Sequence, residues 1–281
     1  MLFDQITIIG VGLIGGSVGL AAKARGVAGR VIGVDRDPAT IETAVRLGAL
    51  DAGGTDLAAG VAGAGLVVVC TPVDHVAGVV VAAAAHVQPG TLITDAGSTK
   101  ARIVAEVRGK LPPRVEFVPA HPVAGSEKSG PEHGRADLFL NRATAVVMSP
   151  FGADWERTVR VGRFWEALGS HVVLMNAEEH DRTLAFTSHM PHAVAAAVAG
   201  VTHSDWLRIT GGGFRDVTRI AAGDPQLWAA IFEANRSATL AALDAFSARL
   251  AEFRTLLAAG DGAGLVRWLT EGKQVRDALG T

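Results

Sequence analysis

The sequence predicts an α/β protein in which a mostly parallel sheet covered by helices is followed by an all-helical domain. Over residues 1–176, short β-branched runs alternate with helical stretches, which is the pattern of successive βαβ units. From residue 177 to residue 281 the strand signals stop, and Ala, Leu and Phe recur at helical spacing. We therefore expect two domains, 1–176 and 177–281, each long enough to bury a core.

Seven apolar runs predict the strands of the first domain. They are 6–9, 31–34, 66–70, 91–94, 116–118, 143–148 and 172–175. Between the second and third of them, Asp37, Pro38 and Gly48 have the cap, first-turn and end positions of a helix. In the second domain the predicted helical segments are 177–202, 204–207, 213–222, 225–257 and 263–279, and the glycine run 211–213 is predicted as a loop or hinge.

The composition excludes several classes of protein. With 49% hydrophobic and 19% charged residues, the chain should fold, and its formal net charge of −2 gives no electrostatic footprint for nucleic acid or an anionic membrane. Pro72 and Asp74 interrupt the apolar stretches before they reach the roughly 20 residues of a membrane span. A single cysteine, Cys70, excludes an internal disulfide and fits a reducing compartment. We expect a cytoplasmic protein that binds neither nucleic acid nor membrane.

A glycine-rich turn follows the first predicted strand and opens a helix. Its residues Gly10, Gly12 and Gly15 match the G-x-G-x-x-G pattern, which allows a tight turn and lets a pyrophosphate approach the backbone amides at a helix N-terminus. An isolated match can also be a flexible turn, but the strand-to-helix context favours a nucleotide site. We therefore predict a Rossmann-type domain whose cofactor contacts are Gly10, Gly12, Leu13, Ile14 and Gly15.

Two further segments predict how the cofactor lies. Asp35 ends the second strand about twenty residues after the last glycine, where a carboxylate can bind the ribose hydroxyls, which favours NAD over NADP. The neighbouring Arg36 could accommodate a 2′-phosphate, and a turn role for Asp35 is the structural alternative. Thr71, Pro72 and Ser98 follow later strands and are predicted to line the nicotinamide end, although Ser98 could instead cap a helix.

The segment 121–130, His-Pro-Val-Ala-Gly-Ser-Glu-Lys-Ser-Gly, is the most informative polar stretch and is predicted as a reactive loop. A histidine titrates near neutral pH, so His121 suits proton transfer; a purely structural hydrogen bond is the alternative. A second polar cluster extends from Ser188 to Arg219. In it, His189 and His192 could satisfy their own helix, and no third ligand at matching spacing supports a metal site.

Six motifs together resemble the prephenate/arogenate (cyclohexadienyl) dehydrogenase family of tyrosine biosynthesis. They are the glycine turn 10–17, Cys-Thr-Pro-Val at 70–73, Asp-Ala-Gly-Ser-Thr-Lys at 95–100, the segment 121–130, Ser-His-Met-Pro-His at 188–192, and Gly-Gly-Phe-Arg-Asp-Val-Thr-Arg-Ile-Ala at 212–221. The resemblance implies NAD-dependent oxidative decarboxylation of prephenate to 4-hydroxyphenylpyruvate. Arogenate, which would give tyrosine, is the alternative substrate, alone or beside prephenate.

The resemblance also implies catalytic roles for three residues. Removing a hydride from the ring carbinol requires an acceptor for its hydroxyl proton, and His121 is the expected base. Ser98 is expected to contact both nicotinamide and substrate. Arg219 is expected to bind a substrate carboxylate through its guanidinium fork, whereas a place on a solvated helix face or an ion pair with Asp216 is the structural alternative.

By the same comparison, Ser126, Glu127, His192 and Trp228 are expected to bind substrate, and the helical domain is expected to form a homodimer. Trp228 could instead pack a core. A dehydrogenase acting on a β-hydroxyacid or an imine explains fewer of the motifs. A non-catalytic dinucleotide-sensing protein remains a further alternative, which the combination of His121, Ser98 and Arg219 disfavours.

Overall fold

The structure, a computed structural model, describes residues 1–113, 115–126, 128–148 and 155–280. The chain forms two compact units, Met1–Asn235 and Arg236–Thr281. The first unit contains both sheets, and the second is a helical hairpin. The predicted order of a mostly parallel sheet followed by helices is confirmed.

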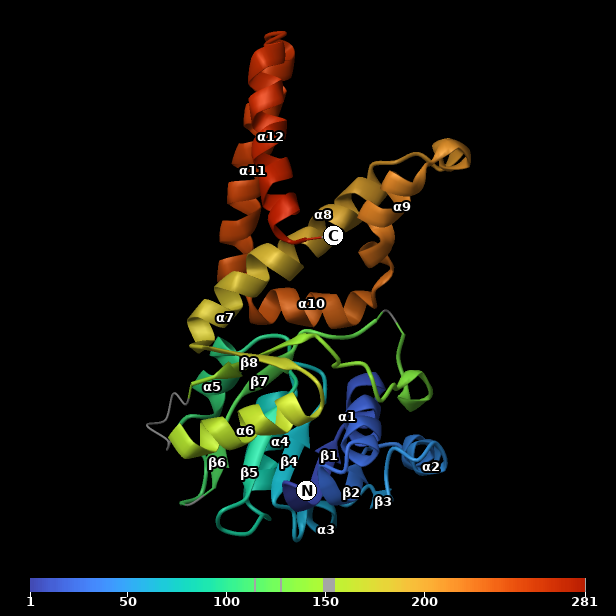
Figure 1. The fold of residues 1–281 in the computed structure, drawn as a ribbon, viewed down its shortest axis with the longest axis vertical. Coiled ribbons are helices and arrows are strands. Elements are labelled where there is room, and N and C mark those ends of the chain that lie inside the picture. The colour runs from blue at the N-terminus through green and yellow to red at the C-terminus, as the bar shows by residue number, and fades with distance from the viewer. Residues whose placement is uncertain (114, 127, 149–154, 281) are drawn as a thin grey trace. The chain divides into compact units, whose positions relative to one another are not determined.

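The main sheet has six parallel strands in the order β3-β2-β1-β4-β5-β6 (Figure 1). The strands are β1 Phe3–Ile9, β2 Ala28–Val34, β3 Ala52–Gly54, β4 Leu66–Val69, β5 Leu92–Asp95 and β6 Glu116–Phe117. The connecting helices are α1 Leu13–Ala24, α2 Pro38–Arg46, α3 Leu57–Val61, α4 Val76–Ala84 and α5 Ala101–Val107. Strand order reverses between β1 and β4, and ligands of open α/β sheets bind beyond the carboxyl ends of the strands at such a point.

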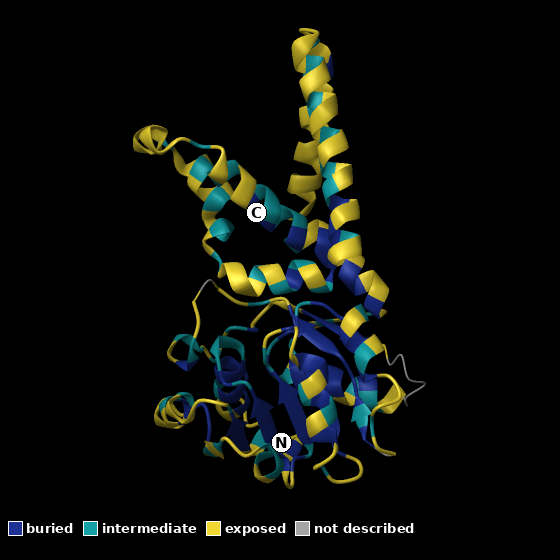
Figure 2. Ribbon diagram, turned by 180° about the vertical axis from the view of Figure 1, so that it is seen from behind, coloured by how far each residue is buried: buried dark blue, intermediate teal, exposed yellow. Residues whose placement is uncertain are grey.

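Helices cover both faces of this sheet, so most residues in the middle of its strands are apolar. Ile8 and Val68 belong to one buried cluster, whereas Ile9 and Val69 belong to a second one on the opposite face. Figure 2 shows the strands as a buried layer beneath the more exposed helices. Burial on both faces fixes which side chains of each strand point to which face of the sheet.

A second, three-stranded sheet carries the start of the segment that was predicted to be a loop. It consists of β7 Ala120–Pro122, β8 Ala143–Val147 and β9 His171–Met175; β7 pairs antiparallel and β9 pairs parallel with β8. The prediction was wrong for His121 and Pro122, which lie in β7. So short a strand, ending in proline, has no β-branched run that periodicity could detect. The strand β3, Ala-Gly-Gly, escaped prediction for the same reason.

The chain after β9 is helical, but the predicted segment 177–202 is not one regular helix. Helix α7 (Ala177–Leu184) passes through a π-helical turn at Ala185–His189 into α8 (Met190–Gly200). Pro191 follows this turn, and a proline inside a helix lacks the amide donor and clashes with the preceding turn. A wider π turn accommodates that defect.

Two further predictions for the helical part were wrong. Gly212 and Gly213 open helix α9 (Gly212–Thr218), which is followed by the 3₁₀ turn η4 (Arg219–Ala222), so only Gly211 lies outside the helix. The predicted helix 225–257 divides at Asn235 into α10 (Pro225–Ala234) and α11 (Arg236–Ala258). The Asn235 side chain donates to the backbone oxygen of Asp181 over 2.7 Å, a tertiary contact that helical periodicity cannot reveal.

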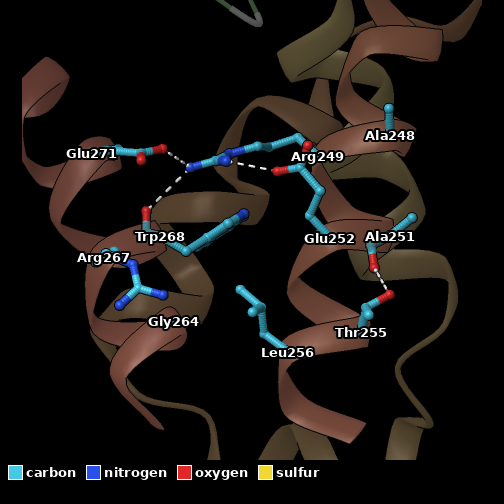
Figure 3. Close-up of a pocket in the computed structure, with 10 residues that line it drawn as sticks. All are labelled: Ala248, Arg249, Ala251, Glu252, Thr255, Leu256, Gly264, Arg267, Trp268 and Glu271. Carbon is cyan, nitrogen blue, oxygen red and sulfur yellow. Dashed lines mark hydrogen bonds and ion pairs between the residues drawn. The ribbon is translucent and has the colours of Figure 1, made fainter. Parts of the chain in front are cut away.

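The second unit is an antiparallel pair, α11 and α12 (Gly262–Ala278). Asp261 caps α12 by accepting from the amide of Gly264 over 2.8 Å. Figure 3 shows the open groove between the two helices, where Arg249 binds Glu252 and Glu271 and lies 4.7 Å from the ring centre of Trp268. Among the described helices, none is both long and apolar enough to cross a membrane.

Candidate active site

The glycine turn after β1 is shaped by close backbone contacts. A Cβ on Gly10, whose φ is +87°, would lie 2.8 Å from the carbonyl carbon of Cys70, and one on Gly15 would lie 2.1 Å from the oxygen of Gly10. In contrast, nothing lies within 4 Å of a Cβ built on Gly12. Gly12 precedes α1 without a side-chain cap, and the open space beside it at the start of the helix suits a phosphate.

Side chains that follow β2 and β4 lie beside this turn. One oxygen of Asp35 accepts from the amide of Val11 over 2.8 Å, and the other accepts from the amide of Asp37 over 3.1 Å. The hydroxyl of Thr71 is buried and has no hydrogen-bond partner among the described residues. An orphaned buried hydroxyl beside an open glycine turn fits a ligand group. The residues therefore fit the dinucleotide that the motif predicts.

The other predicted cofactor residues lie around the same turn. Leu13 and Ile14, in the first turn of α1, are half-buried, and Arg36 and Pro72 are exposed. No contact of these four side chains distinguishes a cofactor role from a structural one, so their contacts with the cofactor stay predictions.

His121 lies in β7, directly after the end of β6, with only 9% of its surface exposed. Its Nδ1 atom lies 2.9 Å from Nε2 of His180, a residue of α7. Among the described residues, no hydrogen bond engages Nε2 of His121. One ring nitrogen is thus occupied by the protein, and the other is available to a substrate.

A buried ion pair holds the backbone next to His121. Lys100 binds Asp95, and both side chains are completely buried. Lys100 also donates to the oxygen of Ala120 over 2.8 Å, and the amide of Ala120 donates to Asp95 over 3.1 Å. Both backbone polar groups of the residue before His121 are therefore fixed by one charge pair.

Asp181 joins this pair to His180. Its carboxylate accepts from the amides of Lys100 over 2.7 Å and Ala101 over 2.9 Å, which caps α5. The same carboxylate lies 2.8 Å from Nδ1 of His180. We did not predict roles for Asp95, His180 or Asp181 from the sequence; an aspartate at the end of an apolar strand, with a lysine five residues later, was the one available signal.

Burial keeps the histidines of this cluster neutral. It lowers the pKa of His121 well below its ordinary value, and the neighbouring His180, Lys100 and His189 add to the effect. Burial also lowers the pKa of His180, against the opposing hydrogen bond to Asp181, and it lowers the pKa of His189 to about 4. At neutral pH, His121 is therefore an uncharged base able to accept a proton.

His192 and Trp228 form a stacked pair, with ring centres 3.5 Å apart and planes inclined by 16°. Nδ1 of His192 is buried without a hydrogen-bond partner among the described residues. A Cβ on Gly223 would lie 2.6 Å from the indole nitrogen of Trp228, so the end of η4 closes against the stack. Trp228 also packs against the second buried cluster, as the core alternative predicted.

The remaining predicted site residues are less enclosed. Arg219 is exposed on η4 and forms no ion pair with a described residue, so the alternative pairing with Asp216 does not form. Ser98 is half-buried, and its hydroxyl has no hydrogen bond to a described residue. Ser126 is exposed and accepts from the amide of Lys128 over 3.2 Å. Glu127 lies outside the described residues.

The segment 131–135, which follows His121 in the chain, packs on helix α1. A Cβ on Gly16 would lie 3.3 Å from Cα of Pro131, and the amide of Arg135 donates to the hydroxyl of Ser17 over 3.0 Å. The second half of the glycine turn is therefore occupied by this segment. The glycine turn and the histidine cluster are connected through it.

Comparisons with known proteins cover nearly the whole chain. The family model for the nucleotide-binding domain of prephenate dehydrogenase matches residues 18–174, and the model for its dimerization domain matches residues 176–271. A cyclohexadienyl dehydrogenase from Zymomonas mobilis is 35% identical over 288 residues, which cover 100% of this chain and 97% of that protein. A prephenate dehydrogenase from Bacillus subtilis is 35% identical over 284 residues, which cover 98% of this chain and 76% of that protein.

The fold is similar to solved structures over the same extent. The crystal structure of prephenate dehydrogenase from A. aeolicus in complex with hydroxyphenyl propionate and NAD⁺ has a TM-score of 0.90 and 31% sequence identity, and covers 98% of each chain. The similarity includes both the sheet and the helical part.

Proposed function

We propose, from the premise that this chain belongs to the prephenate dehydrogenase family, that it oxidises prephenate with NAD to 4-hydroxyphenylpyruvate, carbon dioxide and NADH. The observation that carries the proposal is the buried, neutral His121, whose Nε2 has no hydrogen bond to a described residue and whose neighbour Ala120 is bound to Asp95, the last residue of the parallel strand β5. This is the position at which an open α/β sheet presents groups to a ligand.

In the proposed reaction, His121 accepts the proton of the ring hydroxyl at Nε2 while the carbinol carbon loses a hydride. NAD, when bound, is the hydride acceptor. The resulting ring ketone is conjugated to the carbon that carries the carboxylate, so this carboxylate leaves as carbon dioxide and the ring becomes aromatic. The proton on His121 can return to the phenolate oxygen, which balances the reaction and restores the base.

Three further side chains are proposed to bind the substrate. Arg219 is exposed and unpaired with any described residue, so its guanidinium is available to a carboxylate. The free hydroxyl of Ser98 and the buried, unpartnered Nδ1 of His192 offer hydrogen bonds to the same ligand. Ser126, Glu127 and Trp228 are proposed as further substrate contacts, and the stack with Trp228 fixes the plane of the His192 ring.

Cofactor choice rests on Asp35. A carboxylate at the end of β2 can accept hydrogen bonds from the ribose hydroxyls and repels a 2′-phosphate. We therefore propose NAD as the preferred cofactor, with NADP as the weaker one. The adjacent Arg36 is the one basic side chain of this segment that could soften the preference.

We also propose that residues 177–281 form the substrate and dimerisation part of a homodimer, as the match of a dimerization-domain model to residues 176–271 supports. Sedimentation at several protein concentrations measures the stoichiometry. A monomer at micromolar concentration would contradict the proposed dimer. The cytoplasmic location remains a prediction from the single cysteine, Cys70.

The test of the proposed function is a kinetic matrix. Purified protein is assayed for NADH or NADPH formation with prephenate and with arogenate, each with NAD and NADP. We expect the highest kcat/KM for prephenate with NAD. Comparable turnover of arogenate would instead support a dual-specificity enzyme, as the name of the Zymomonas relative suggests. Cofactor binding with no turnover of either substrate would contradict the proposal and favour a dinucleotide-sensing role.

A further inference from the structure

Three buried side chains form a line from helix α5 to the proposed base. Asp181 lies 2.8 Å from Nδ1 of His180, and Nε2 of His180 lies 2.9 Å from Nδ1 of His121. His180 is 0% exposed and Asp181 is 4% exposed. Water therefore has little access to this line, and the protons within it are determined by the groups at its ends.

The end at Asp181 accepts hydrogen bonds. Its two carboxylate oxygens receive the amide protons of Lys100 and Ala101, and a backbone amide can only donate. A carboxylate in this arrangement also accepts from Nδ1 of His180, so Nδ1 carries a proton.

The proton on Nδ1 determines the other ring nitrogen of His180. Because burial lowers the pKa of His180, the ring is neutral and has one proton, which leaves Nε2 as an acceptor. The hydrogen bond between the two histidines then requires His121 to donate through Nδ1. His121 is neutral too, so its Nε2 carries the lone pair.

We propose that His180 and Asp181 are positioning residues that hold His121 as the Nδ1-protonated tautomer, with Nε2 aimed outward as the base. This inference rests on the proposed function for the role of His121 in catalysis, but the tautomer itself does not depend on any substrate. Without an acceptor at Nδ1, the imidazole would divide between two tautomers and could turn about its side-chain bonds.

The chemistry also explains why a second imidazole stands between the carboxylate and the base. A carboxylate in direct contact with His121 would favour the charged imidazolium and hold the base protonated. A neutral imidazole fixes the direction of the proton without placing a negative charge against His121. The groups around His121, which are His180, Lys100 and His189, all oppose its protonation.

The backbone of His121 is held separately from its ring. The pair Asp95 and Lys100 binds both polar groups of Ala120, and this clamp includes no atom of His180. A change at His180 should therefore release the ring while β7 stays in place. This separation makes the proposal testable in folded protein.

Two substitutions at His180 differ in one property. His180→Phe keeps a ring but cannot accept a hydrogen bond from Nδ1 of His121. In His180→Gln, the side-chain oxygen can accept that hydrogen bond. Thr144→Val is the matched control. Thr144 lies in β8, the strand that pairs with β7, and the substitution removes its buried hydrogen bond of 2.8 Å to Ser170. It should lower the free energy of unfolding by a similar amount without changing a contact of Asp181, His180 or His121.

The first measurement is the nitrogen NMR spectrum of the imidazole rings in the full-length protein with NAD and no substrate, with the His121 signals assigned by their loss in His121→Asn. We expect a protonated Nδ1 and an unprotonated Nε2 in the wild type, in Thr144→Val and in His180→Gln. In His180→Phe, the two nitrogens should show averaged or exchanged protonation. A protonated Nε2 in the wild type, or an unchanged spectrum in His180→Phe, would overturn the proposal.

The second measurement is steady-state turnover. We expect His180→Phe to lower kcat by about 10²-fold with KM for prephenate and affinity for NAD nearly unchanged, and we expect His180→Gln to recover most of that loss. Equal kcat losses in His180→Phe and Thr144→Val would indicate a structural role and contradict positioning. If no variant turns over either substrate but the spectra agree with the expectation, the proposed function fails and the tautomer assignment stands.

Discussion

The glycine turn follows β1 of the main sheet, whereas the histidine cluster is built around β7 of the second sheet, and the two use different parts of the chain. At the turn, backbone atoms form the site: Gly10 and Gly15 leave no room for a side chain, and the space beside Gly12 is open. At the cluster, buried side chains from two segments, 95–100 and 180–181, hold the proposed base, His121, and its neighbour Ala120. We call the glycine turn the cofactor half and the histidine cluster the catalytic half. We infer that the cofactor half is sensitive to any added Cβ at its glycines, whereas the catalytic half depends on single polar side-chain atoms.

The largest expected effect separates the two halves directly. His121→Asn should lower kcat by about 10²- to 10⁴-fold, because it removes the proton acceptor. Affinity for NAD, measured by titration calorimetry, should stay within about twofold, since the contacts of the glycine turn are made by backbone atoms and by Asp35 rather than by the His121 ring. A parallel loss of NAD affinity would mean that the two halves are not independent.

The buried charge pair should make the catalytic half sensitive to a single deletion. Lys100→Met leaves Asp95 buried without a cation and should lower the free energy of unfolding by about 3–5 kcal/mol in urea. The double variant Asp95→Asn/Lys100→Met should recover a large part of that stability, because no charge remains. If the double variant were as unstable as the single one, packing rather than charge would explain the site.

Acid should weaken the catalytic half through His189. Its pKa is lowered from 6.5 to about 4 in the folded protein, so the unfolded chain binds the proton first as pH falls. Stability is therefore full above pH 6.5 and declines between pH 6.5 and 4, by up to about 3 kcal/mol.

The variant His189→Asn should show a shallower decline of the urea midpoint over this range. The exposed His171→Asn serves as control and should follow the wild type. If the urea midpoint declined equally with pH in all three proteins, His189 would not contribute to the loss of stability in acid.

The smallest effect belongs to the cofactor half. Gly12→Ala should weaken NAD binding by about tenfold, because its methyl group enters the open space, and should leave stability unchanged. Gly78→Ala, in a helix with nothing within 4 Å of the added carbon, is the control. It should bind NAD normally and gain about 0.5–1 kcal/mol of stability. Normal NAD binding by Gly12→Ala would show that the open space does not receive the cofactor.

The same contrast explains what could be predicted from the sequence. The glycine turn is a contiguous motif between a strand and a helix, so Gly10, Gly12 and Gly15 could be recognised from their neighbours in the sequence. The long apolar strands were predicted within a few residues for the same local reason. His121 was recognised by its motif, but its placement in β7 was not, because pairing with β8 creates that strand.

The rest of the site depends on contacts between distant segments. His180 lies 59 residues from His121, and Asp181 lies 81 residues from Lys100, so neither spacing nor periodicity joins them. The break of the predicted helix 225–257 has a similar origin, since Asn235 bonds to Asp181 and His189. These features depend on hydrogen bonds between buried polar groups of distant segments, which local sequence patterns do not reveal.

The most direct test of His121 as a buried, neutral base is the pH dependence of kcat/KM for prephenate at saturating NAD. This profile reports the pKa of the base in the enzyme that has not yet bound prephenate. Because burial lowers the pKa of His121 well below 6.5, activity should stay flat through pH 6.5 and fall only in more acidic solution, within the range where the protein remains folded. An acid limb at or above pH 6.5 would contradict a buried, neutral His121.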